Sequence, residues 1–520
     1  MRLALRRAAH PGTSSLRCSA APRRLPRCAV APLCSASHAA LPAGSSVLIL
    51  SPVWPEWRSS AAGVRTAALV RAFTSWGWRV TYASTSDADN AYAAELAAAG
   101  VAARQLQSNR EAQLAQILEE AAPDVVLFDR FTSEEMFSFR VRQLRPQALR
   151  VLDTQDLHAL RRARAALHAA GASPADVLAA CPGADDADAV RELSAIARCD
   201  AALICSPEEH RRLVSYYCVP RRKLLLASFF VPPPLAHAGR GAEVPSYGER
   251  AHVAFVGNYR HAPNADGAQA LAKKGGVWDA LRPSLPPGAE CHLYGSYETG
   301  AARQLHDLKR GVRFLGHAAD VAVLARYRLL LAPLRFGAGI KGKLLDSWSF
   351  GTPCVTTPLG AEGCLPGLDA PWRCDFDTQP DGAPAGDWAG LGVGPEGSQR
   401  GAEDTLSWGG AWHNCDDPAA MAAAAAELYT DEVAWTRAQA TGFALLRELF
   451  AEGPALGAVR AGLCRLAAER DAARAGDFTA AMLWHHGARS TEFFSRFIEA
   501  KEALATERAA KETTTPRCDG

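Results

Sequence analysis

Residues 331–346 read Leu-Ala-Pro-Leu-Arg-Phe-Gly-Ala-Gly-Ile-Lys-Gly-Lys-Leu-Leu-Asp, and this stretch decides the fold. An apolar strand runs into a glycine-rich turn, which leads into a helix. Gly337, Gly339 and Gly342 allow a ligand to approach the backbone closely, and the start of the helix presents free N–H groups. Lys341 and Lys343 add positive charge in a chain that has only eight lysines among its 57 basic residues. The pattern predicts a site for an anionic ligand such as a pyrophosphate.

Two nucleotide-binding patterns can also be fitted to this stretch. The three glycines satisfy G-x-G-x-x-G, and Glu362 lies about twenty residues further on, where a dinucleotide-binding protein has its ribose ligand. That pattern usually follows the first strand of its unit, whereas here it comes late. Residues 337–343 also fit G-x-x-x-x-G-K, but Leu344 stands where a P-loop needs Ser or Thr for Mg²⁺. The sequence therefore excludes a P-loop triphosphatase and leaves a dinucleotide site open.

Short β runs alternate with helical windows on both sides of this stretch. The alternation predicts an α/β fold of two Rossmann-like domains, at 45–230 and 251–450. A Pro- and Gly-rich linker at 231–250 separates them, an irregular insertion at 365–411 interrupts the second, and a helical tail at 451–520 follows. We expect the carboxyl ends of the two parallel sheets to face each other across a cleft.

Individual elements follow from apolar runs and helical periodicity. In the first domain the expected strands are 47–50, 78–83, 124–128, 150–152, 200–205 and 223–227, with helices at 61–76, 92–99 and 111–121. In the second domain the expected strands are 252–256, 290–294, 312–315, 329–332 and 354–357, with helices at 264–281, 302–309, 321–327, 343–349, 418–429 and 433–451. Residues 493–503 are amphipathic and suit either packing on the first domain or a partner.

The overall composition excludes several classes of protein. Of 520 residues, 48% are hydrophobic and 22% are charged, so the chain can bury large cores. A formal net charge of +2 provides no global basic field for nucleic acid. No apolar run reaches the roughly 18 residues of a transmembrane segment. The 14 cysteines form no C-x-x-C pair, and the histidines beside Trp412 and Trp484 lack partners at metal-ligand spacing, so we expect no metal.

The first 44 residues have the composition of a targeting segment. Seven arginines and no acidic residue precede Glu56, among many Ala, Ser and Pro. An Arg-rich, Ser-bearing and acid-free segment is typical of organelle transit peptides. We therefore expect residues 1–44 to lie outside the fold and to direct the protein to the chloroplast, with the mitochondrion as the alternative.

Five motifs follow in order through the second half of the chain: 255–264 (FVGNYRHAPN), 312–317 (VRFLGH), 333–343 (PLRFGAGIKGK), 351–357 (GTPCVTT) and 360–363 (GAEG). Together they resemble the donor-binding half of the GT-B glycosyltransferases of family 4, the group 1 transferases. The resemblance is strong over about 250–365, continues to about 450 and is weaker over 46–230. It implies a GT-B fold in which a nucleotide-sugar donor binds the second domain.

The resemblance also assigns roles to residues of the second domain. Lys341 and Lys343 would neutralise the diphosphate, most of all as it leaves, and the glycines 337, 339 and 342 would surround it. Gly257 and Arg260 follow the first strand, where the family makes backbone and basic contacts to the donor.

The acidic positions of the family are only partly kept. Asp346 stands where the family often has a glutamate that holds the donor ribose, although it also suits the first turn of a helix. The family's other acid would fall on Ala338 and is missing. Glu362, in the next loop, is placed to face the donor.

Two first-domain positions complete the expected site. Gly63 lies where the family has a glycine-bearing loop near the phosphates, and it would otherwise simply permit a turn. Residues 153–158 resemble the acceptor-side segment, in which His158 would orient the sugar or its acceptor; the alternative is a surface histidine on a helix. We thus expect His158, Lys341 and Lys343 to be catalytic.

The implied function is transfer of a sugar from a nucleotide diphosphate donor to an unidentified hydroxyl acceptor, with retention of anomeric configuration and without a metal. Two alternatives remain at this point. One is an NAD(P)-dependent oxidoreductase that uses Glu362 on the ribose. The other is an inactive GT-B protein that binds a nucleotide sugar, since the acid expected at Ala338 is missing.

Overall fold

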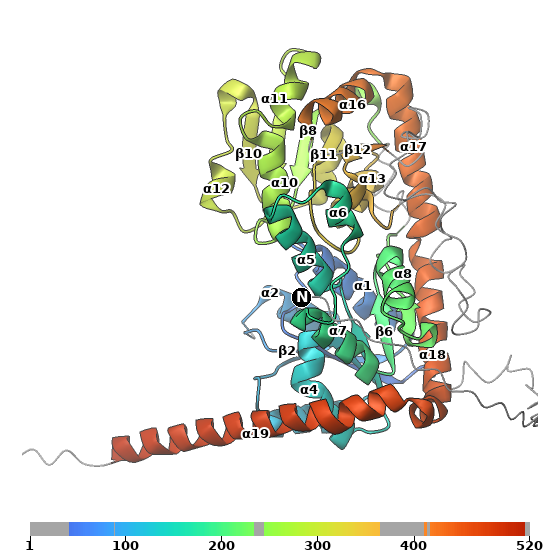
Figure 1. Ribbon diagram of the computed structural model, residues 1–520, viewed down its shortest axis with the longest axis vertical. Coiled ribbons are helices and arrows are strands. Elements are labelled where there is room, and N and C mark those ends of the chain that lie inside the picture. Colours follow the sequence, from blue (N-terminus) through green and yellow to red (C-terminus); the bar gives the residue numbers. More distant parts are fainter. Residues whose placement is uncertain (1–40, 88, 233–243, 365–409, 413–416, 515–520) are drawn as a thin grey trace, which may run out of the picture.

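The computed structural model describes residues 41–87, 89–232, 244–364, 410–412 and 417–514, and the chain forms two α/β domains followed by long helices (Figure 1). Residues 1–40 of the expected transit peptide lie outside the described residues, as do residues 365–409 of the insertion and 233–243 of the linker. Residues 41–44 were expected to lie outside the fold but belong to it, since Leu41 is buried in the first domain and the Gly44 N–H donates to the Gly77 carbonyl at 2.8 Å.

The first domain contains a sheet of seven parallel strands in the order β3-β2-β1-β4-β5-β6-β7. The order reverses between β1 and β4, which makes the carboxyl ends of these strands the usual place for a ligand site. The bounds are β1 (Ser46–Ser51), β2 (Arg79–Ser84), β3 (Ala102–Gln105), β4 (Val125–Asp129), β5 (Leu149–Asp153), β6 (Ala201–Ile204) and β7 (Leu224–Leu226). The sequence missed β3, because this partly exposed edge strand has no apolar run.

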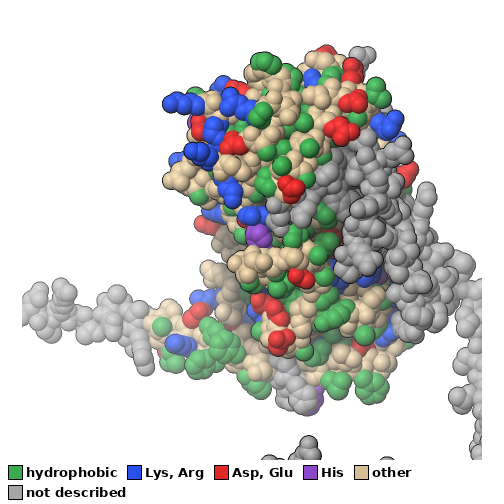
Figure 2. Space-filling view, turned by 45° about the horizontal axis from the view of Figure 1, so that its top comes forward, with side chains coloured by type: hydrophobic (Ala, Val, Ile, Leu, Met, Phe, Trp, Pro, Cys, Tyr) green, Lys and Arg blue, Asp and Glu red, His purple; other side chains and the backbone are tan. Residues whose placement is uncertain are grey.

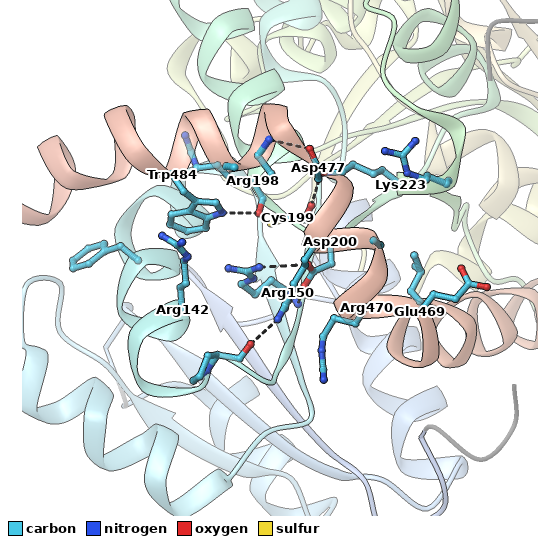
Figure 3. A pocket seen from close by; sticks show the side chains of 18 of the residues that line it. Arg142, Arg150, Arg198, Cys199, Asp200, Lys223, Glu469, Arg470, Asp477 and Trp484 are labelled. Atoms are coloured by element: carbon cyan, nitrogen blue, oxygen red, sulfur yellow. Dashed lines mark hydrogen bonds and ion pairs between the residues drawn. The ribbon is translucent and has the colours of Figure 1, made fainter. Parts of the chain in front are cut away.

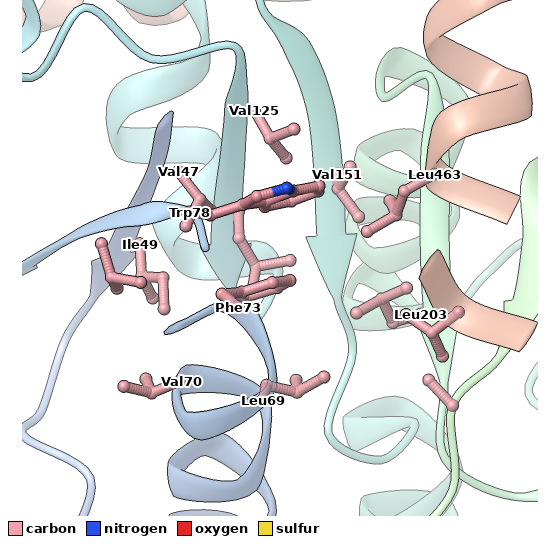
Figure 4. Close-up of a cluster of buried hydrophobic side chains, with 14 of the residues drawn as sticks. Val47, Ile49, Leu69, Val70, Phe73, Trp78, Val125, Val151, Leu203 and Leu463 are labelled. Carbon is pink, nitrogen blue, oxygen red and sulfur yellow. The ribbon is translucent and has the colours of Figure 1, made fainter. Parts of the chain in front are cut away.

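Helices cover both faces of this sheet. They are α1 (Ala61–Ser75), α2 (Ala91–Ala98), α3 (Glu111–Ala121), α4 (Phe131–Leu144), α5 (His158–Ala169), α6 (Pro174–Ala179), α7 (Ala187–Arg198) and α8 (Pro207–Ser215). Side chains alternate between two cores: Val47 and Ile49 pack into one cluster, and Leu48 and Leu50 into the other. Figure 4 shows the first cluster, in which Phe73 and Trp78 stack with ring centroids 5.5 Å apart.

The second domain has a parallel sheet in the order β10-β9-β8-β11-β12-β13. The strands are β8 (Ala251–Val256), β9 (Cys291–Tyr294), β10 (Val312–Gly316), β11 (Tyr327–Ala332), β12 (Cys354–Thr356) and β13 (Gly410–Trp412). The helices are α10 (Ala262–Ala272), α11 (Val277–Leu281), α12 (Gly300–Arg303), α13 (Gly342–Ser349), α14 (Pro358–Ala361), α16 (Pro418–Thr430) and α17 (Glu432–Leu449). The two parallel sheets confirm the expected α/β fold.

Three predicted helices of the second domain differ in the structure. The helix expected at 302–309 is reduced to the short α12, which ends at Arg303, and a 3₁₀ turn over Leu308–Arg310. The helix expected at 264–281 is divided into α10 and α11, because Lys273 leaves the helical conformation with a ψ of 157°. Gly275, with a φ of +76°, then turns the chain before α11. The helix expected at 321–327 is a 3₁₀ helix over Val321–Arg326, and Tyr327 already begins β11.

The chain returns to the first domain after α17. The Val231 N–H donates to the Phe450 carbonyl at 2.8 Å, and the Glu452 N–H donates to the Val231 carbonyl at 3.2 Å, so the two interdomain segments pair where they cross. Helix α18 (Glu452–Gly476) then packs on the first domain, where Val459 and Leu463 are buried in the cluster that contains Val47.

Helix α19 (Phe478–Thr514) runs past α4 and α7 and extends beyond the body as an arm (Figures 1 and 2). Within the amphipathic segment 493–503, Glu499 forms an ion pair with Arg140 of α4. The aromatic side chains of Phe493, Phe494 and Phe497 instead stay mostly exposed, and hydrophobic side chains line the arm in Figure 2. None of the described helices has both the length and the apolar character needed to cross a membrane.

We predict that Leu463→Ala destabilises the first domain by about 2–5 kcal/mol, because it leaves a cavity where α18 packs on the sheet. Leu463 is 1% exposed. The control is Val433→Ala on α17, where a 69% exposed side chain should change stability by less than about 0.5 kcal/mol. Urea unfolding measures both, and equal effects would show that α18 contributes no core.

Candidate functional site

The glycine-rich loop between β11 and α13 packs directly on the first domain. The Gly339 N–H donates to Glu209 Oε1 at 2.9 Å, and a Cβ on Gly339 would lie 3.0 Å from Cβ of Asp156. A Cβ on Gly342 would lie 3.0 Å from that of Ala61. Gly337 and Gly339 have φ values of +145° and +64°, which favour glycine. These glycines thus permit close contact between the domains at the carboxyl ends of both sheets.

The two lysines of this motif have different surroundings. Lys341 is buried, its Nζ donates to the Gly339 carbonyl at 2.6 Å, and burial lowers its pKa. Lys343 Nζ donates to Asn264 Oδ1 at 2.7 Å and lies 4.3 Å from the centre of the Phe255 ring. Burial lowers the pKa of Lys343 to about 7. Both cations flank the first turn of α13, whose free N–H groups also favour an anion.

Asp346 lies one turn further along α13, on the same side as Lys343. Burial raises the pKa of its carboxyl to about 7, and the Lys343 charge opposes this shift. A carboxyl that is only partly ionised near neutral pH can donate as well as accept a hydrogen bond. Asp346 is therefore placed to contact a hydroxyl group next to the lysines.

Glu362 connects the domains. Its two carboxylate oxygens each lie 2.7 Å from a guanidinium nitrogen of Arg164 on α5, and Arg164 Nη1 also donates to the Gly337 carbonyl at 2.9 Å. Burial raises the pKa of Glu362, but the charge and hydrogen bonds of Arg164, together with the charges of Lys341 and Arg212, outweigh it and bring the pKa to about 2. Glu362 is thus an ionised structural partner of Arg164, and both of its oxygens are occupied.

Gly63, Gly257 and Arg260 lie near the same interface. A Cβ on Gly63 would lie 2.4 Å from the carbonyl carbon of Glu56, and one on Gly257 would lie 2.8 Å from the Asn264 side chain. Arg260 is exposed, with its guanidinium carbon 3.8 Å from the centre of the Tyr297 ring. The Tyr297 hydroxyl donates to Glu56 Oε2 at 2.7 Å, so this loop also joins the domains.

His158 begins α5, with Nε2 3.3 Å from Asp156 Oδ1. Burial lowers the pKa of His158 to about 4, so the ring is neutral near pH 7. Asp156 also binds Arg161 at 2.9 Å, and Arg161 Nη1 lies 3.4 Å from His261 Nε2 of the second domain. Sequence reasoning missed Arg161 and His261, because only the folded chain brings α5 next to the loop after β8.

Beneath His158 lies a buried polar network that sequence reasoning also missed. Arg65 Nη1 lies 2.6 Å from both oxygens of Asp153, and the Gln155 amide donates to Asp129 Oδ1 at 2.9 Å. The Ser51 hydroxyl donates to Asp129 at 2.6 Å. Ser51, Asp129 and Asp153 end β1, β4 and β5, and Arg65 reaches them from α1. The available signal was an acid that terminates each of two apolar strands. The network holds the segment that carries His158.

Residues 250–371 match the family model described as "Glycosyl transferases group 1". This range contains Gly257, Arg260, both lysines, Asp346 and Glu362. No curated protein sequence matches the chain.

The chain carries a group 1 glycosyltransferase domain.

Solved structures of glycosyltransferases share the fold of the whole two-domain body. A Rickettsia africae glycosyltransferase aligns with a TM-score of 0.53 at 10% identity, covering 80% of this chain and 96% of that one. Anabaena HepE in complex with UDP and glucose aligns with a TM-score of 0.53 at 11% identity, covering 80% and 98%. A sucrose-phosphate synthase from Thermosynechococcus elongatus aligns with a TM-score of 0.52 at 14% identity, covering 82% and 100%. The fold of the two domains is therefore GT-B.

One cluster in the described part of the chain has the composition of a metal site. His252, Glu290 and His292 have potential ligand atoms within 4.8 Å of one another. Glu290 is already held by Arg313 at 2.7 and 2.8 Å and by His292 at 2.9 Å. The cluster also lies at the amino ends of β8 and β9, away from the glycine-rich loop. It therefore belongs to the second domain's own polar contacts.

We predict that Arg164→Met destabilises the protein by about 3–5 kcal/mol, because it leaves the Glu362 carboxylate buried without its main partner. Adding Glu362→Met should restore much of the lost stability, since the double variant leaves neither charge buried. A double-mutant cycle in urea measures this coupling. Additive losses would show that the two side chains do not act as a pair.

Proposed function

We propose that this protein transfers a sugar from a nucleotide diphosphate sugar to a hydroxyl acceptor, with retention of anomeric configuration. One observation carries the proposal: two lysines and the start of α13 converge within the segment that matches the group 1 family model. Two cations together with a helix N-terminus match the several negative charges of a diphosphate better than one cation alone would. UDP-sugars are the first donors to test, since HepE is seen with UDP and glucose.

In the proposed step, the bond between the anomeric carbon and a diphosphate oxygen breaks. A bond to the acceptor oxygen forms on the same face of the sugar, and the acceptor proton passes to the departing diphosphate. Negative charge grows on the leaving group, so Lys341, Lys343 and the helix dipole of α13 stabilise the transition state more than the ground state. Lys341 exchanges its contact with the Gly339 carbonyl for a phosphate oxygen. No metal takes part in this proposal.

The remaining site residues position the reactants. Asp346 contacts the donor ribose, and Gly257 and Arg260 contact the donor from the loop after β8. The neutral His158 donates or accepts a hydrogen bond at the transferred sugar or its acceptor, which suits a ring with a pKa of about 4. The acceptor approaches from the first domain.

The structure does not favour a dinucleotide-dependent oxidoreductase. The glycine pattern follows β11, the fourth strand of its domain in chain order, instead of the first. The carboxylate that would hold the ribose, Glu362, is occupied by Arg164. An inactive protein that binds a nucleotide sugar is separated from the enzyme by measuring turnover alongside binding.

We predict that Lys341→Ala/Lys343→Ala weakens binding of the matching UDP-, GDP- or ADP-sugar roughly 100-fold, because each lysine contributes about tenfold through a charge-assisted contact. Thermal shift and isothermal titration calorimetry measure this effect. A donor at 100 times its Kd should stabilise the wild type by about 2.7 kcal/mol. Turnover, measured as release of the nucleoside diphosphate, should fall about 10²–10³-fold.

The matched control is Lys273→Ala/Lys274→Ala, which removes two adjacent exposed lysines outside the site. This variant should bind and turn over as the wild type does. Donor binding that survives loss of Lys341 and Lys343 would refute the assigned site. Stabilisation by NAD or NADP alone would refute the transferase, and binding without any turnover would identify the inactive protein.

We predict that donor affinity falls as pH rises from 6 to 8. Lys343 has a pKa of about 7, so it loses its charge over this range while the diphosphate stays fully ionised. The Kd should rise by up to about tenfold per pH unit above 7. Lys343→Arg keeps a charge throughout and should flatten the profile. Asp346 ionises over the same pH range, and its negative charge would also weaken binding of the diphosphate as the pH rises. The pH profile of Asp346→Asn is therefore measured alongside.

An unchanged pH profile in both of these variants would show that neither Lys343 nor Asp346 titrates next to the donor.

A further inference from the structure

A cavity of about 540 Å³ lies at the opposite end of the first sheet from the candidate donor site (Figure 3). Its floor is where strands begin: Arg150 is the second residue of β5, Asp200 directly precedes β6 and Lys223 directly precedes β7. The end of α18 and the beginning of α19 cover it. The glycine-rich loop contacts the carboxyl ends of the same strands, so the two sites are distinct.

The lining of this cavity is strongly basic. Eight Lys and Arg side chains line it, against four carboxylates. Two of the carboxylates are fully engaged by the protein itself. Arg474 holds Asp200 through two nitrogens at 2.7 and 2.6 Å, and Lys223 Nζ lies 2.6 Å from Asp477 Oδ2. Two further cations, Arg198 and Arg470, pair with Glu134 and Asp471 outside the lining. Among the rest of the lining the cations still outnumber the carboxylates, so the cavity retains an excess of positive charge.

Arg142 and Arg150 carry this excess beside Trp484. Their guanidinium carbons lie 4.8 and 5.3 Å from the centre of the indole ring. Arg142 forms no ion pair within the described part of the chain, and burial and the charges of Arg150 and Arg474 lower its pKa. Arg150 reaches Asp200 only at 3.4 Å, and its buried Nε has no hydrogen-bond partner among the described residues.

These features describe a site suited to an anion. A buried donor without a partner is costly, and like charges held close together repel each other. A guanidinium presents paired N–H groups that match a phosphate, and a dianion would compensate both arginines at once. The volume lies within the range of small-molecule sites, so the cavity has room for more than the anion.

We propose that this cavity binds a soluble small molecule that carries a phosphate group, such as a sugar phosphate, with Arg142 and Arg150 as its anion-binding residues. A bound ligand contacts both the corner between α18 and α19 and the amino ends of β5, β6 and β7. Because α18 begins at the crossing of the interdomain segments, the ligand stabilises the helix that links the second domain back to the first.

The test is isothermal titration calorimetry of the full chain with glucose 6-phosphate, inorganic phosphate and uncharged glucose. We expect the two phosphates to bind and glucose not to bind. Ala473→Glu places a carboxylate on a residue that lines the cavity and should weaken phosphate binding at least tenfold. Ala472→Glu makes the same change on the neighbouring exposed residue outside the lining and should stay within twofold. Arg142→Gln removes an exposed arginine and should weaken binding about tenfold.

The donor site is a second place where a phosphate can bind, so each titration is repeated in Lys341→Ala/Lys343→Ala. Binding that survives there and is lost in Ala473→Glu supports the proposal, whatever the fate of the proposed transferase activity. Binding that is lost with the two lysines and kept in Ala473→Glu overturns it. Failure of both phosphates to bind at 10 mM overturns it too, as does binding only to phosphatidylcholine vesicles that contain phosphatidic acid.

Discussion

The docking of the glycine-rich loop 333–341 on the first domain is the contact on which the relative placement of the two domains depends. Three ionisable side chains surround it: Arg164 and Glu209 from the first domain and Glu362 from the second. A buried charge is tolerated only when it is paired, so the Arg164–Glu362 contact restricts how α5 and the loop can approach each other. Glu209 adds directional contacts by accepting the N–H groups of Leu157 and Gly339. Burial raises its pKa to about 8, so it is largely protonated at neutral pH.

The same loop therefore forms both the interdomain contact and the candidate donor site. Gly339 lies against Asp156 and Cys205, and Lys341, two residues later, points its Nζ back to the Gly339 carbonyl. A donor that draws Lys341 onto its diphosphate alters a group within 4.0 Å of Glu362. If the donor binds this loop as proposed, donor binding and domain contact are coupled through neighbouring charges, and we expect a substitution in this loop to affect stability and binding together.

The first sheet presents chemically different surfaces at its two ends. At the carboxyl ends of β4 and β5, acids such as Asp129 and Asp153 are satisfied by Arg65 and Gln155, which yields a rigid base beneath His158. At the amino ends of β5, β6 and β7, arginines outnumber their acidic partners and α18 and α19 cover them. The long C-terminal helices thereby connect the end of the second domain to the amino ends of the strands in the first.

The sequence by itself determined the fold class, the order of most strands along the chain and the position of the lysine-bearing loop. Parallel strands are buried on both faces, so each leaves a short apolar run that can be recognised locally, whereas the half-exposed β3 leaves none. Glycine at positions 337 and 339 likewise indicates a backbone with positive φ, which other residues rarely adopt. The tertiary structure alone decided what these groups contact. Glu362 suggested a donor ligand, but its partner Arg164 lies 198 residues earlier, and no local pattern encodes a pairing across that separation. Arg161, His261 and the basic cavity beneath α19 depend in the same way on elements that meet only after folding.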